Sequence, residues 1–275
     1  MLHGGILSPF DPHVLKARFD AGTPFRHVVV DGFLDPGFAE QAAASFPGFG
    51  EARQLGFGFD FVNEREKIQI SEAEKFPEPI TRLNAALASR EFLADLEIVT
   101  GIPRLLADEQ LAGGGMHVTG PHGRLDVHVD FNYARERGLH RRLNLLLYLN
   151  PGWDETWGGE VELWDAEVRN CQRAVAPTLG RCLLFETSEI SFHGVRPLRC
   201  PSDRARQSFA AYYYTREPPA GWNGRSHGTR FRARPDERFR RFVSMPVEKA
   251  WRRGRRLLRR SARRLRRRGG PPGGP

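Results

Sequence analysis

The chain has 275 residues, of which 40% are hydrophobic and 27% are charged. This balance supplies one sizeable hydrophobic core, or at most two, and excludes a wholly disordered chain. No apolar run approaches the length of a transmembrane helix, and residues 1–10 lack the basic and apolar regions of a secretory signal. We therefore expect a cytoplasmic protein, with peripheral attachment to a membrane as the alternative location.

The first hundred residues predict one strand and three helices. Residues 25–33 contain a Val-Val-Val run and predict the strand. The helices are expected over residues 36–46, 78–88 and 90–100. Asp35 and Pro36 are typical of a helix cap and first turn, Ser89 of the cap of the third helix, and Gly101 of its end.

Beyond Leu111 the hydrophobic pattern changes to a period of two. Short apolar runs separated by Gly, Pro and Asn occur at residues 125–131, 143–150, 159–165, 181–186 and 206–215. This spacing predicts an all-β sandwich or barrel that follows the helices.

The positive charge lies at the carboxyl end of the chain. Residues 250–275 hold eleven arginines and no acidic residue, so removing them from the net charge of +9 leaves −2 for residues 1–249. Between residues 247 and 268, Trp251, Leu258 and Leu265 recur at helical spacing among the arginines, which predicts a basic amphipathic helix. Such a helix suits an anionic membrane surface or nucleic acid phosphates, and a solvated tail without a partner is the alternative.

One apolar run carries polar residues that suit a metal. Leu125, Val127 and Val129 alternate with Asp126, His128 and Asp130, so the side chains of the last two share a face of the predicted strand. His193, after a later apolar run, is the best candidate for a third ligand. Two histidines and one carboxylate form the facial triad that binds Fe(II) and leaves open positions. A chain of this composition and length is expected to contain about 0.4 His-x-Asp triplets by chance, so the triplet alone does not establish a metal site. The alternative is that His128 faces solvent.

The surrounding motifs carry more information than the triplet. They are His128-Val-Asp-Phe-Asn132, Arg142-Leu-Asn-Leu-Leu-Leu-Tyr-Leu-Asn150, Trp157-Gly-Gly-Glu-Val-Glu-Leu-Trp164, Leu183-Leu-Phe185, His193-Gly-Val195 and Arg206-Gln-Ser208. In this order and spacing the sequence resembles the 2-oxoglutarate and Fe(II)-dependent dioxygenases, specifically the branch similar to the catalytic domain of the prolyl 4-hydroxylase alpha subunit. The resemblance covers residues 111–215.

The resemblance implies a mainly β fold with flanking α-helices. Its core would be a double-stranded β-helix, the jelly-roll related to cupins, preceded by N-terminal helices and followed by the basic helix. The expected organisation is an N-terminal α/β support region of the same domain (1–110), the dioxygenase core (111–216) and an arginine-rich extension (217–275).

The resemblance also implies which residues form the site. His128, Asp130 and His193 would be the catalytic residues and the Fe(II) ligands. In this family an arginine after the second histidine binds the distal carboxylate of 2-oxoglutarate. Arg206 is the first choice because it begins a strand whose Ser208 shares its face, and Arg204 is the second. The expected cofactor-binding residues are Arg206, Tyr148, Ser208 and His117.

The implied activity is hydroxylation of an unactivated C–H bond with O2 and 2-oxoglutarate as co-substrates and ascorbate as a reductant. A prolyl residue of a protein or peptide is the expected target. The alternatives are the same chemistry on a small molecule, glycan or lipid intermediate, and a catalytically silent barrel with a polyanion- or membrane-binding tail. Residues 50–75, which include three phenylalanines, suit either a lid over the site or an ordinary packed loop.

Overall fold

The computed structural model describes residues 5–237, and the expected basic helix at residues 247–268 lies outside them. Contacts divide the chain into two compact units, residues 1–232 and residues 233–275. All the strands and helices named below belong to the first unit. The sequence predicts a core that ends at residue 216, whereas the strand Arg230–Phe231 also pairs with the barrel.

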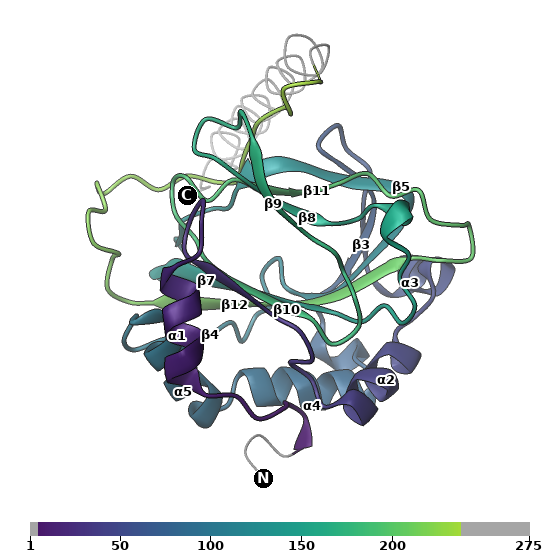
Figure 1. The fold of residues 1–275 in the computed structure, drawn as a ribbon, viewed down its shortest axis with the longest axis horizontal. Helices are drawn as coiled ribbons and strands as arrows, with labels where there is room; N and C mark the ends of the chain where they lie inside the picture. The colour runs from purple at the N-terminus through teal and green to yellow at the C-terminus, as the bar shows by residue number, and fades with distance from the viewer. Residues whose placement is uncertain (1–4, 238–275) are drawn as a thin grey trace, which may run out of the picture. The chain divides into compact units, whose positions relative to one another are not determined.

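The barrel is one continuous antiparallel sheet (Figure 1). Its strand order is β1 (His27–Val30), β10 (Cys182–Glu186), β7 (Leu139–Tyr148), β12 (Arg206–Thr215), β5 (Gly115–Val129), β11 (His193–Val195), β8 (Val161–Trp164) and β9 (Cys171–Val175). Five further strands pair at its margins: β2 (Phe57–Phe59), β3 (Glu64–Ile70), β4 (Leu106–Ala107), β6 (Tyr133–Ala134) and β13 (Arg230–Phe231). This architecture is the expected jelly-roll core.

Strand β5 is shared by the two halves of the barrel. Its first five residues pair with β12, and its last residues pair with β11. The sequence pattern predicts only the second half of this strand, because Gly120, Pro121 and Gly123 interrupt the alternation in the first half. Strand β12, by contrast, has the expected bounds.

The helices are α1 (Pro12–Asp20), α2 (Pro36–Ser45), α3 (Phe49–Leu55), α4 (Glu78–Leu87) and α5 (Arg90–Thr100), with 3-10 turns η2 (Ala73–Lys75) and η3 (Glu155–Trp157). The predicted caps are present, since Asp35 accepts from Phe38 N, Ser89 accepts from Phe92 N, and Gly101 has a φ of 69°. Helices α1 and α3 were not predicted, because they are short and bury few side chains. Within the described residues, no helix combines the length and apolar character needed to cross a bilayer.

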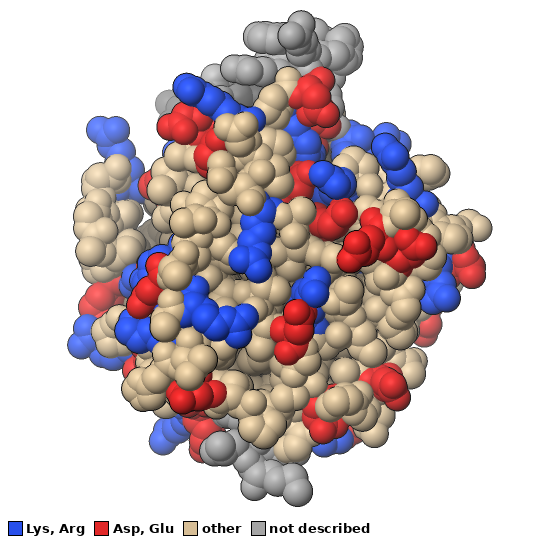
Figure 2. All heavy atoms as spheres, in the orientation of Figure 1, with Lys and Arg blue, Asp and Glu red and all other residues tan. Residues whose placement is uncertain are grey.

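Residues 50–75 are neither a free lid nor an irregular loop. They form α3 and a β2–β3 hairpin, and β3 pairs along β5 from Met116 to Leu125. The hairpin exposes Phe57, whose side chain is 62% accessible, and Phe61. Figure 2 shows acidic and basic side chains intermixed over the visible face of the described body.

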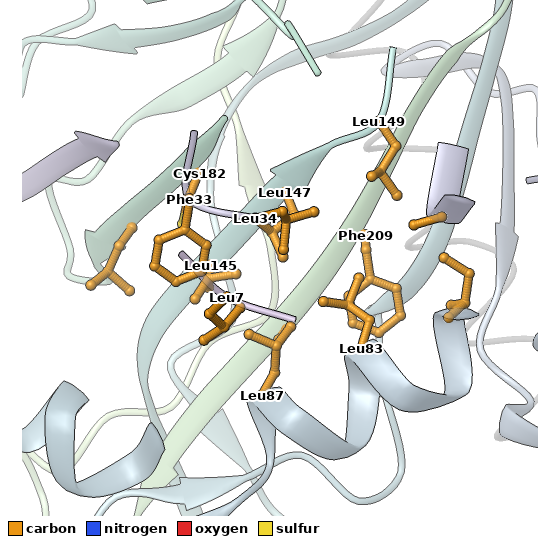
Figure 3. Close-up of a cluster of buried hydrophobic side chains, with 14 of the residues drawn as sticks. Leu7, Phe33, Leu34, Leu83, Leu87, Leu145, Leu147, Leu149, Cys182 and Phe209 are labelled. Atoms are coloured by element: carbon orange, nitrogen blue, oxygen red, sulfur yellow. The ribbon is translucent and has the colours of Figure 1, made fainter. Parts of the chain in front are cut away.

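The main hydrophobic core lies between the helices and the outer face of the sheet (Figures 1 and 3). In β7, Leu143, Leu145 and Leu147 belong to this core, while Tyr148 belongs to a separate cluster inside the barrel. Helix α4 contributes Leu83 and Leu87, and Leu83 lies beside Phe209 of β12 in Figure 3. The helices therefore support the strands whose opposite faces line the barrel interior.

We expect Leu83→Ala to lower the free energy of unfolding by about 2–5 kcal/mol, because Leu83 is fully buried and its truncation leaves a cavity. Val14→Ala in α1 is the control, since Val14 is 56% exposed and should change stability by less than about 0.5 kcal/mol. Chemical denaturation of the two variants measures the difference. Equal stabilities would contradict the proposed role of α4 as the support of the sheet.

Candidate metal centre

The structure brings His128, Asp130 and His193 together. His128 lies near the end of β5, Asp130 follows that strand, and His193 begins β11 as the direct cross-strand partner of His128. The potential ligand atoms all lie within 4.8 Å of one another. His128 Nε2 is 3.7 Å from Asp130 Oδ1, and His193 Nε2 is 3.6 Å from Asp130 Oδ2. The three residues therefore fit one metal ion.

Backbone carbonyls fix the orientation of both imidazole rings. His128 Nδ1 lies 2.9 Å from the carbonyl oxygen of Asp126, and His193 Nδ1 lies 2.9 Å from that of Ser191. A carbonyl can only accept, so each Nδ1 carries the proton and each Nε2 keeps its lone pair. This is the arrangement that a metal-binding histidine requires.

The protonation states also suit a divalent metal. Burial, followed by the charge of His193, lowers the pKa of His128 to about 3, and burial lowers the pKa of His193. Burial alone would raise the pKa of Asp130, but the neighbouring positive charges, above all Arg141, bring it below its usual range. The site thus offers two neutral nitrogens and one carboxylate, the donor set of non-heme Fe(II).

Arg141, the buried arginine beside the carboxylate, was not predicted from the sequence. Its Nη2 lies 3.2 Å from Asp130 Oδ2, and Asn144 Nδ2 donates to the same oxygen at 2.8 Å. The Arg141 guanidinium also stacks on Tyr212, with Cζ 3.5 Å from the ring centroid. An irregularity in the pairing of β7 with β12 breaks strict alternation between Arg141 and Leu143. A strict period of two would have assigned Arg141 and Asn144 to opposite faces.

Arg206 lies buried inside the barrel. Its Nε donates to Gly159 O at 2.7 Å and its Nη1 to Ser208 Oγ at 3.2 Å. Its Cζ lies 5.1 Å from the centroid of the Tyr148 ring. Burial lowers the pKa of Arg206, and among the described residues no carboxylate forms an ion pair with it. Arg204, the alternative, is exposed and lies over the Trp157 ring.

Tyr148, Ser208 and His117 occupy adjacent positions on neighbouring strands. Ser208 is the cross-strand partner of both His117 and Tyr148, so the three side chains share one face of the sheet. Burial raises the pKa of Tyr148 to about 12, although the nearby Arg206 guanidinium acts in the opposite direction. His117 Nε2 instead lies 3.0 Å from Gly113 O. The assignment of these residues to 2-oxoglutarate stays a prediction.

We expect acid to destabilise the metal-free protein through His128. Its pKa falls from 6.5 to about 3 on folding, so between these values the unfolded chain binds a proton that the folded chain excludes. This contribution to stability is complete above pH 6.5 and is lost as the pH falls, by about 2 kcal/mol at pH 5. His128→Gln removes it, so the stability of the variant should depend less steeply on pH. Denaturation at several pH values measures both slopes, and equal slopes would contradict the shift.

Comparisons with known proteins agree with this geometry. Residues 114–214 match the model of the 2OG-Fe(II) oxygenase superfamily. Prolyl 3-hydroxylase OGFOD1 of Mus musculus is 30% identical over 78 residues, which make up 27% of this chain and 14% of that protein. The aligned segment therefore spans a small part of this relative.

Two solved structures share the fold. A Trichoplax adhaerens prolyl hydroxylase, in complex with a peptide of the hypoxia inducible factor oxygen degradation domain, has 18% identity and a TM-score of 0.53; the match covers 74% of this chain and 90% of that one. A Pseudomonas putida prolyl-4-hydroxylase has 18% identity and a TM-score of 0.52, covering 74% of this chain and 100% of that one. These two likenesses show the fold, while residues 114–214, which contain the two-histidine, one-carboxylate cluster, match the model of the 2OG-Fe(II) oxygenase superfamily.

Proposed function

We propose that the chain is an active Fe(II)- and 2-oxoglutarate-dependent dioxygenase that hydroxylates a prolyl residue of a protein or peptide. One observation carries the proposal. The His128, Asp130 and His193 cluster and the buried Arg206, which forms no ion pair among the described residues, line the same barrel. A buried guanidinium is costly without an anionic partner, and a dicarboxylate co-substrate supplies one.

The site residues have different roles in the proposed reaction. His128, Asp130 and His193 would hold Fe(II), which with 2-oxoglutarate and O2 supplies the oxidising chemistry. Arg206 would bind the distal carboxylate of 2-oxoglutarate, and Tyr148 Oη would donate to that carboxylate. Asn144 and Arg141 hold Asp130 in its ionised form.

The choice of a prolyl substrate rests on similarity to prolyl hydroxylases. The same constellation would also oxidise a small molecule, glycan or lipid intermediate, so the substrate needs a direct test. Ascorbate would serve as a reductant that restores Fe(II). His117 and Ser208 would contribute to the 2-oxoglutarate pocket through their positions beside Tyr148 and Arg206.

We expect Arg206→Gln to weaken 2-oxoglutarate binding by about tenfold to a hundredfold, because it removes a charge-assisted hydrogen bond. Anaerobic titration of the Fe(II)-loaded protein with 2-oxoglutarate measures this through the visible charge-transfer band. Arg204→Gln is the matched control, since Arg204 is exposed, and its affinity should equal that of the wild type. If Arg204→Gln weakens 2-oxoglutarate binding and Arg206→Gln does not, Arg204 is the residue that binds the carboxylate. No band in the wild-type protein would favour the silent-barrel alternative.

We expect a proline-containing peptide to stimulate conversion of 2-oxoglutarate to succinate and to gain the mass of one oxygen atom. The same peptide with alanine in place of proline should do neither, because it lacks the ring C–H bonds. Succinate assay and mass spectrometry of a peptide library measure both quantities. Stimulation by small molecules but by no peptide would favour the alternative substrate class. His128→Ala is the control that should abolish turnover.

We further propose that the arginine-rich residues 250–275 bind an anionic membrane surface from the cytoplasmic side. The concentration of charge supports this role. Retention on anionic vesicles should fall with salt and disappear on truncation after Lys249, whereas equal retention on RNA would favour nucleic acid.

A further inference from the structure

The chain returns to the metal centre after the last long strand of the barrel. Residues 216–232, here named the strap, follow β12 and include β13 near their end. Arg230 and Phe231 pair antiparallel with Val129 and His128 of β5, and Arg232 N donates to Val127 O at 2.8 Å. The strap therefore pairs with the strand that carries the first metal-ligand histidine.

Phe231 lies against the ring of that histidine. Directly paired residues of an antiparallel sheet project to the same face. The Phe231 and His128 ring centroids are 5.3 Å apart, with 36° between the planes. His128 in turn lies 4.3 Å from His193, and His193 lies 4.7 Å from Phe185. The two histidines are thus the middle members of a row of four rings, and a phenylalanine closes each end.

The strap is anchored to the two loops that flank the metal ligands. Asn132, two residues after Asp130, donates to Arg225 O at 3.1 Å and accepts from His227 N at 2.9 Å. Glu189, four residues before His193, lies 2.7 Å from His227 Nε2 and forms an ion pair with Arg230. These contacts fix β13 in register with β5.

We infer that Phe231 is a positioning residue of the metal centre: its ring holds the His128 imidazole in its ligating orientation and shields it from water. The inference rests on the proposed function. The backbone bond to Asp126 O fixes one edge of the imidazole, and Phe231 restricts its rotation from one face. Residues that orient metal ligands typically affect metal affinity about tenfold to a hundredfold.

The experiment titrates metal-free full-length protein with Co(II), whose visible spectrum reports ligand geometry. Phe231→Ala should bind Co(II) about tenfold more weakly than wild type and show an altered spectrum. Phe231→Tyr, which keeps the ring, should restore both properties. Phe57→Ala is the matched control, because Phe57 is an exposed phenylalanine of β2 outside the row of four rings, and it should behave as wild type.

Glu189→Gln supplies an independent test, because Glu189 is half exposed and anchors the strap without belonging to the ligand cluster. It should weaken Co(II) binding in the same direction and add little in the Phe231→Ala background, since both changes act through β13. Thermal unfolding of the metal-free variants shows whether a variant has lost its fold or only the positioning of His128. If Phe231→Ala does not fold, Glu189→Gln is the variant that tests the inference.

The outcomes separate the two proposals. Wild-type protein that binds no Co(II) contradicts the proposed function. If the wild-type protein binds Co(II) and Phe231→Ala has the same affinity and spectrum, only the role of the strap is overturned. If Phe231→Ala does not fold, the same result in Glu189→Gln overturns it.

Discussion

The pairing of β11 with β5 is the constraint on which the rest of the site depends. His193 is the direct cross-strand partner of His128, and this register sets the two rings 4.3 Å apart although 65 positions separate them in the chain. Antiparallel pairing with one face toward the interior allows little slippage, because a shift of one residue would send the ligand to the opposite face. The helices on the outer face and the long strand β5, shared by both halves of the barrel, maintain that register.

Two buried arginines give the interior its electrostatic character, and they differ in their partners. Arg141 lies beside Asp130 and is stacked on Tyr212, so its charge is compensated within the protein. Arg206 donates to two neutral oxygens, Gly159 O and Ser208 Oγ, and forms no ion pair within the described part of the chain. Burial of a guanidinium costs free energy in both cases, and an anionic ligand would offset this cost at Arg206. This contrast separates the residue that supports a metal ligand from the residue that is suited to bind a co-substrate.

The wall of the metal centre is assembled from distant parts of the chain. Phe185 of β10 covers one histidine, Phe231 of β13 covers the other, and the anchors of the strap lie in loops next to Asp130 and His193. Such an apolar shell controls solvent access and keeps the imidazoles neutral. One ring of this wall, Phe231, lies outside the 114–214 segment that matches the family model.

The sequence by itself determined the features that depend on neighbouring residues. Ser89 and Gly101 mark the ends of α5, a short apolar run marks β12, and a period of two puts His128 and Asp130 on one side at the end of β5. These signals act within one turn of helix or a few residues of strand. His193 was a candidate because it follows a later apolar run, and the roles of His193 and Arg206 came from the family resemblance.

Only the tertiary structure decided what depends on pairing between distant segments. The pairing irregularity that brings Arg141 to Asn144, the burial that distinguishes Arg206 from Arg204, and the return of Phe231 to His128 leave no local pattern in the chain. Each results from the register of strands whose residues are far apart in sequence. Register is set by the packing of the whole sheet against its core, so a local reading of the sequence does not contain it.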